Sequence, residues 1–148
     1  MAITQAMCTS FKKQLLEAEH NFKASGGSTF KIALYTGLAS IGPDTTAYTS
    51  IGEAAGTGYT AGGNTLTVTT SPTYGNNTYG VPTAYISFSN VTWTSASFTA
   101  RGALIYNTSQ SNKSVAVLDF GGDKTVTGTN FTVQFPTANS SNAIIRIT

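Results

Sequence analysis

Few side chains in this sequence could do chemistry, and the two most reactive ones stand alone. Cys8 is the only cysteine, and His20, twelve positions further on, is the only histidine. A catalytic thiol needs a base beside it, and a free cysteine usually behaves as a small buried apolar residue. We therefore expect Cys8 to be buried, and His20 to be a polar residue on the surface of a helix rather than a metal ligand.

Two carboxylates, Asp119 and Asp123, flank Gly121-Gly122 in a stretch typical of a β-turn. Carboxylates on such a turn can bind Ca²⁺, but their spacing does not fit the twelve-residue calcium loop. Arg101 could pair with either of them, which would be a structural contact. The stretch also lacks the full glycine pattern and the helix of a phosphate-binding loop. We expect no catalytic residue, no metal site and no cofactor, and thus a protein that is not an enzyme.

The composition is that of a weakly charged globular protein. Only 9% of the residues are charged and the net charge is +2, too little to neutralise many phosphates of a nucleic acid. Hydroxyl and amide side chains (26 Thr, 15 Ser and 10 Asn) provide solubility instead. No apolar run approaches the length of a membrane span, and the first residues lack the pattern of a secretion signal. We expect a protein that is made in the cytoplasm and binds neither nucleic acid nor membrane.

The first 26 residues form the only segment with helical periodicity. Apolar residues recur at intervals of three and four, which lines up one face of an α-helix: Met7, Phe11, Leu15, Ala18 and Phe22. This pattern predicts an amphipathic helix from about Thr9 to Asn21, with Lys13 and Glu17 paired on its wet face and Gly26-Gly27 beyond its end.

The rest of the chain, residues 27–148, has the pattern of short β-strands. Residues 29–36 alternate as a half-buried strand does, 37–63 are predicted to form a long glycine-rich loop, and 71–82 a turn-rich excursion. Further strands are expected at 64–70, 84–91, 93–100, 102–106, 115–120, 130–135 and 143–147, separated near the end by turns at 107–113, 121–129 and 136–142. About eight strands indicate one all-β domain over 1–148, an antiparallel β-sandwich or jelly roll with one N-terminal amphipathic helix.

Tyrosines are concentrated in the two Gly/Asn-rich stretches: Tyr48, Tyr59, Tyr74 and Tyr79. Tyr and Asn provide contact area together with adaptable hydrogen bonds, a chemistry typical of interfaces. These loops are therefore candidates for contact with sister subunits, with a protein lattice or with glycans.

Several blocks of the sequence resemble small virion structural proteins of tailed bacteriophages. The resemblance spans the whole length and rests on residues 1–12, 29–36, 56–65, 101–107, 116–124 and 131–136. It is strongest for capsid decoration (cement) proteins, which are compact β-domains, often trimeric, where hexamers of the major capsid protein meet. It implies a non-enzymatic protein of the virion that binds the outer capsid surface, bridges capsomers and stabilises the DNA-filled head.

This resemblance defines the expected partners, which are the major capsid protein and further copies of the chain in a homotrimer. We expect the capsid-binding surface to include the charged N-terminal segment, with Met7, Phe11, Lys12, Lys13 and Lys23. The alternative is a tail or fibre component that binds host surface glycans through the tyrosine-bearing loops.

Overall fold

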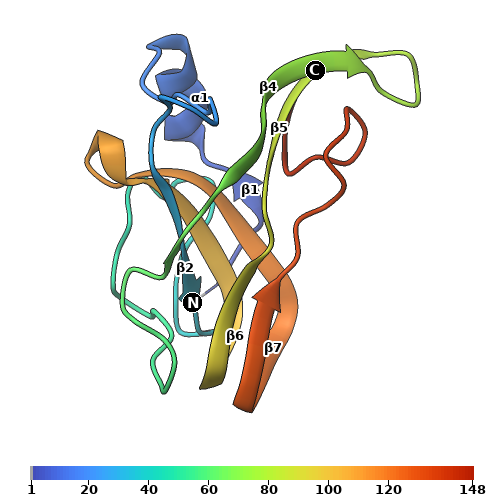
Figure 1. The fold of residues 1–148 in the computed structure, drawn as a ribbon. Coiled ribbons are helices and arrows are strands. Elements are labelled where there is room, and N and C mark those ends of the chain that lie inside the picture. Colours follow the sequence, from blue (N-terminus) through green and yellow to red (C-terminus); the bar gives the residue numbers. More distant parts are fainter. Residues whose placement is uncertain (1) are drawn as a thin grey trace.

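The structure is a computed structural model that describes residues 2–148. Within these residues the chain is mostly β, with eight strands in two antiparallel sheets and one short N-terminal helix, in a sandwich-like arrangement (Figure 1). This confirms the predicted all-β class. The elements are β1 (Ala6–Met7), α1 (Thr9–Leu16), β2 (Phe30–Tyr35), β3 (Asn64–Thr65), β4 (Val68–Asn76), β5 (Pro82–Phe88), β6 (Val91–Asn107), the 3₁₀ turn η1 (Thr108–Gln110), β7 (Lys113–Val133) and β8 (Ile145–Ile147).

The five-stranded sheet has the order β1-β7-β6-β2-β3 and is built on the long β6–β7 hairpin. The turn predicted at 107–113 joins these strands, but the one predicted at 121–129 is wrong. There β7 continues, and its pairing with β6 shifts register between Ala100 and Gly102, opposite Gly121-Gly122. Glycine-rich irregularities of this kind bend a strand without ending it. The short strands predicted between residues 93 and 135 are therefore parts of two long strands, β6 and β7.

The N-terminal helix is shorter than predicted, because it ends at Leu16 instead of Asn21. Ala18 has a left-handed backbone, with φ of +58°, and turns the chain back towards the sheet. Phe22 is therefore buried from an irregular segment rather than from a helix, and its ring stacks on Phe30 with centroids 4.3 Å apart.

Strand β2 is buried on both faces, whereas the sequence pattern predicts a half-buried strand. The loop of residues 36–63 covers the second face: Tyr48 stacks on Tyr106 of β6, and the Tyr35 hydroxyl donates a hydrogen bond to the carbonyl oxygen of Thr49. At its end, Gly63 has a φ of +70°, and a Cβ there would lie 1.8 Å from the Ile32 carbonyl oxygen. Only glycine allows the loop to approach β2 so closely.

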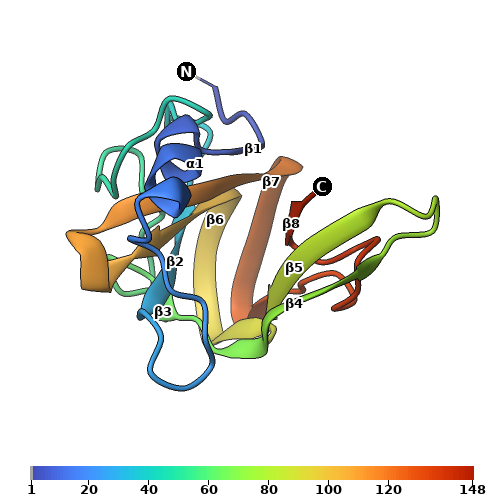
Figure 2. The same ribbon diagram turned by 90° about the horizontal axis from the view of Figure 1, so that it is seen from above.

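The three-stranded sheet, with the order β4-β5-β8, carries the β4–β5 hairpin, Val68–Phe88, which we call the arm. The arm projects from the body of the molecule, with the C-terminal segment beside it (Figures 1 and 2). The turn-rich excursion predicted at 71–82 is wrong for its first half, since β4 extends to Asn76. Pro72, which cannot donate to a ladder, lies where the register shifts between Thr70 and Thr73 on an edge strand.

One continuous core joins the N-terminal segment to both sheets. It contains Ile3, Cys8, Phe11 and Phe22 together with buried residues of β2, β5, β6, β7 and β8. The first 26 residues are thus integral to the folded structure, and Phe11 and Cys8 are fully buried in it.

Candidate partner-binding surface

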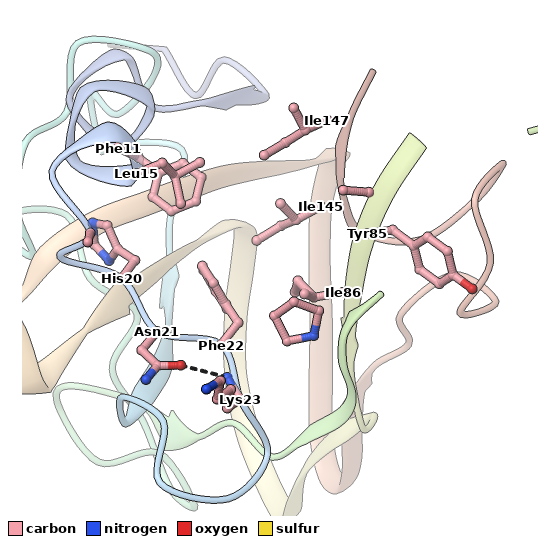
Figure 3. A pocket seen from close by; sticks show the side chains of 13 residues that line it. Phe11, Leu15, His20, Asn21, Phe22, Lys23, Tyr85, Ile86, Ile145 and Ile147 are labelled. Atoms are coloured by element: carbon pink, nitrogen blue, oxygen red, sulfur yellow. Dashed lines mark hydrogen bonds between the residues drawn. The ribbon is translucent and has the colours of Figure 1, made fainter. Parts of the chain in front are cut away.

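An apolar groove of about 380 Å³ lies between the N-terminal segment and the base of the arm. Leu15 and Phe22 line one side and Ile86, Ile145 and Ile147 the other, as Figure 3 shows. Asn21 and Lys23 supply polar groups at this site. A concave, mostly apolar surface with few polar groups is the usual form of a binding site.

His20 helps to hold the N-terminal wall of the groove in place. Its Nδ1 accepts a hydrogen bond from Nδ2 of Asn107 (3.0 Å), and its Nε2 donates one to Oε1 of Gln14 (2.8 Å). The pKa of His20 is lowered mainly by burial. The negative charge of Glu19 raises this pKa, and the positive charge of Lys113 lowers it further. The predicted helix-surface position of His20 is wrong, because the chain has already left the helix and turned inward.

One face of the arm extends from the groove to a solvent-exposed surface. Strand register places Tyr74, Ala84 and Ile147 in one row across β4, β5 and β8, next to the row of Ile86 and Ile145 that lines the groove. Tyr74 is 86% exposed and Ile147 is 51% exposed. This apolar sheet face has no cover within residues 2–148.

The opposite face of the arm is covered by the segment between β7 and β8. Ser140 donates a hydrogen bond to the Asn76 carbonyl oxygen (2.7 Å), and the Ser141 hydroxyl bonds to Thr78 (2.9 Å). Thr83, on that face of β5, is buried. The arm is therefore braced from one side and free on the other.

A compact turn presents the tip of the arm. The side-chain oxygen of Asn77 accepts hydrogen bonds from the backbone N–H groups of Tyr79 (2.9 Å) and Val81 (3.0 Å). This bonding fixes the loop while the Tyr79 side chain stays 90% exposed. The whole arm, residues 68–88, contains no Asp, Glu, Lys, Arg or His.

The predicted capsid-binding residues are not all on the surface. Phe11 is completely buried and packs against His20 and Phe22, so its prediction as a contact residue is wrong. Met7 is half-buried in β1, paired with Ala116 of β7. The remaining three, Lys12, Lys13 and Lys23, are exposed; Lys13 pairs with Glu17 (3.0 Å), as the sequence predicts.

The four predicted contact tyrosines separate into two pairs. Tyr74 and Tyr79 are exposed on the arm, whereas Tyr48 and Tyr59 are used inside the chain. Their hydroxyls donate hydrogen bonds to the carboxylate of Glu53, at 2.7 Å and 2.6 Å, and Gly62 N–H donates a third bond of 2.7 Å. Burial, with the nearby Glu53 charge, raises the pKa of Tyr48, Tyr59 and neighbouring Tyr106, the last to about 12.

Sequence reasoning missed Glu53, the centre of this Glu53–tyrosine cluster. The available signal was a loop with seven glycines between positions 37 and 63 that contains only two carboxylates, Asp44 and Glu53, the second of them between Tyr48 and Tyr59. A loop of this length needs internal hydrogen bonds to take one conformation, and an acidic residue between two tyrosines is a candidate acceptor.

The other candidate reactive groups have structural surroundings. Cys8 is buried as predicted, and burial raises the pKa of its thiol. Arg101 lies 3.9 Å from Asp123, which confirms one of the two predicted pairs. Among residues 2–148, no three His, Cys, Asp or Glu side chains lie close enough together to hold a metal ion. The same residues contain no helix long and apolar enough to cross a membrane.

Together these features define a mostly β, sandwich-like protein with an uncharged projecting arm and an apolar groove at its base. Comparison with known proteins gives no match to a family model, to a curated protein or to a solved structure.

Proposed function

We propose that this chain is a non-enzymatic virion structural protein that decorates the outer surface of a capsid lattice and stabilises the DNA-filled head. The resemblance of its sequence blocks to small virion proteins of tailed bacteriophages supports the class. The observation that carries the role is the arm: an uncharged, braced β-hairpin with exposed Tyr74 and Tyr79, beside an unfilled apolar groove. Exposed apolar surface of this kind is typical of protein–protein contact.

The physical basis of such a role is multivalency. A stable interface buries about 800 Å² on each partner, and one subunit with an arm and a groove can contact more than one neighbour. Many modest contacts on one particle act together, because each bound subunit holds its neighbours at a high effective concentration. Such bridging resists separation of capsomers under the pressure of packaged DNA.

The exposed lysines of the N-terminal segment are the best candidates for the capsid-facing contact. Lys12 and Lys23 have exposed side chains and no ion-pair partner in the described structure. An acidic patch on the major capsid protein would complement them and would direct docking by charge. Deleting residues 1–22 cannot test this, because it would remove core residues such as Phe11 and Phe22.

A binding experiment with particles that lack this protein tests the proposal. Purified protein should bind such particles to saturation in a gradient or by microscopy. We expect Lys12→Glu, which lies outside the groove, to weaken binding about tenfold or more, while Lys124→Glu, an exposed lysine of β7, leaves it unchanged. Failure of the unmodified, folded protein to bind would contradict the capsid role.

A tail or fibre component that binds host glycans is the second candidate. The exposure of Tyr74 and Tyr79 on a hairpin with Asn, Gly and Thr neighbours supports it, since aromatic rings with adjacent amides suit sugar faces. It receives no support from Tyr48 and Tyr59, whose hydroxyls bind Glu53. Direct binding to host-surface glycans, lost in Tyr74→Ser, would favour this candidate.

A further inference from the structure

The same chain carries a projecting apolar element and a recess of complementary character. The tip of the arm displays Tyr79 and Val81, while the groove is walled by Leu15, Phe22 and Ile145. Both surfaces are available in the described structure. The arm tip of one copy and the groove of another copy are therefore complementary in shape and in apolar character.

The arm cannot fill the groove of its own molecule. Ile86 of β5 lines the groove, and Val81 lies five residues further along the hairpin, about 16 Å away in an extended strand. Figure 2 shows the tip on the side of the molecule away from α1. A second chain is therefore needed to bring tip and groove together.

The charges favour a second copy as the occupant. Residues 68–88 carry no Asp, Glu, Lys, Arg or His, so inserting the arm removes no charged side chain of the arm from water. The Tyr79 hydroxyl remains a polar end, and Asn21 and Lys23 at the groove provide polar partners. A tyrosine joins an apolar body to such a polar end.

The contact covers apolar surface that is exposed in the single chain. Covering the Tyr79 side chain, which is 90% exposed, buries on the order of 150–250 Å². The exposed parts of Tyr74, Val81 and Ile147 add to this area, towards the roughly 800 Å² on each partner that is typical of a specific interface. Each subunit offers both halves of the contact and can use them at once.

We infer that the arm tip of one copy occupies the groove of the next, so that the protein self-associates head to tail. Contacts between two different surfaces generate rings when the rotation closes, and a ring of three such contacts would be the homotrimer expected from the sequence. The inference deepens the proposed function by assigning the contact that would form this homotrimer, but it concerns the free protein and does not require the capsid.

Site-directed cross-linking tests the inference. Cys8 is fully buried, so an introduced cysteine is the accessible one. We expect mixed Tyr79→Cys and Lys23→Cys proteins to form an intermolecular disulfide, whereas each variant alone does not. The double variant should give covalent trimers on a non-reducing gel. Cross-linking of Tyr79→Cys with itself, or no cross-link in the mixture, would overturn the arm-in-groove arrangement.

The oligomeric state of surface variants provides the second readout. Tyr74→Ser with Tyr79→Ser should raise the dissociation constant of the oligomer at least tenfold in sedimentation, with unchanged thermal unfolding of the monomer. Leu38→Ser with Ile51→Ser, which alters exposed apolar residues outside the arm and groove, is the matched control and should have no effect. A chain that stays monomeric at about 100 µM would overturn the inference. Capsid binding by such a monomer would leave the proposed function intact.

Discussion

The side-chain amide of Asn107 donates a hydrogen bond to Nδ1 of His20, 3.0 Å away, across the junction of the N-terminal segment and the β6–β7 hairpin. The orientation of this amide is fixed because its oxygen accepts a hydrogen bond from the N–H of Ser109. Nδ1 of His20 must therefore be unprotonated, and Nε2 carries the proton that is donated to Gln14. If Nδ1 were protonated, its N–H would face the amide N–H donor of Asn107.

This geometry predicts that the fold loses stability on mild acidification. Burial lowers the folded-state pKa of His20 below its ordinary value of 6.5. The unfolded chain then binds a proton at a higher pH than the folded chain does, so the free energy of unfolding falls as the pH drops below 6.5. The slope is at most about 1.4 kcal/mol per pH unit.

Urea titrations between pH 7.5 and about 5 measure this effect above the range in which carboxylates titrate. The variant His20→Gln should be less stable at pH 7.5 but should lose most of the pH dependence in this interval. An equal slope in both proteins would contradict the assignment of the effect to His20.

The Glu53–tyrosine cluster is predicted to hold the loop of residues 36–63 on the sheet. Glu53→Gln replaces one acceptor oxygen by a donor opposite Tyr48, Tyr59 or Gly62. Because hydrogen bonds to a charged group are stronger than neutral ones, we expect a loss of about 1–3 kcal/mol in the free energy of unfolding. Asp44→Asn, an exposed residue of the same loop, removes the same charge and should change stability by less than about 0.5 kcal/mol.

Gly121 and Gly63 have similar left-handed backbones but different surroundings, so alanine substitutions at the two positions distinguish backbone strain from steric crowding. Gly121→Ala, at φ of +75° with nothing within 4 Å of the new Cβ, should cost about 1–2 kcal/mol. Gly63→Ala, at φ of +70°, adds a 1.8 Å clash with the Ile32 carbonyl oxygen and should cost several kcal/mol more or prevent folding. Equal thermal denaturation of the two variants would contradict the close approach of the loop to β2.

Phe22 is predicted to tie the N-terminal segment into the core. Its ring is buried against Phe30 and Phe11, so Phe22→Ala should lower the free energy of unfolding by about 3–5 kcal/mol in a urea titration. Leu16→Ala, only six residues earlier but 91% exposed, should change it by less than about 0.5 kcal/mol. Similar effects of the two substitutions would mean that the segment is not packed as described.

Local patterns in the sequence predicted the strands well and their continuity poorly. The alternation at 29–36 identifies β2, and the turn residues at 107–113 identify the β6–β7 connection. The same turn chemistry at Gly121-Gly122 forms a bulge, because the facing strand continues and keeps pairing beyond it. A glycine pair alone cannot distinguish a reversal from a bulge, since the partner strand decides which one forms.

The helix and the site illustrate a second limit, which is set by tertiary contacts. Phe22 has helical spacing from Phe11, yet the stack on Phe30 stabilises a chain reversal at Ala18 instead. Composition identified the tyrosine-bearing loops, but Glu53 decides which tyrosines face inward. The turn-rich excursion predicted at 71–82 is a strand as far as Asn76, because Pro, Gly and Asn also occur in a bulged edge strand.

The copy number of this protein in purified virions tests the proposed decoration role most directly. Quantitative mass spectrometry against the major capsid protein gives the ratio of the two chains. A lattice-wide decoration protein predicts a ratio near one to one. A ratio of a few per hundred capsid subunits would contradict it and would move the chain to the tail or to a vertex.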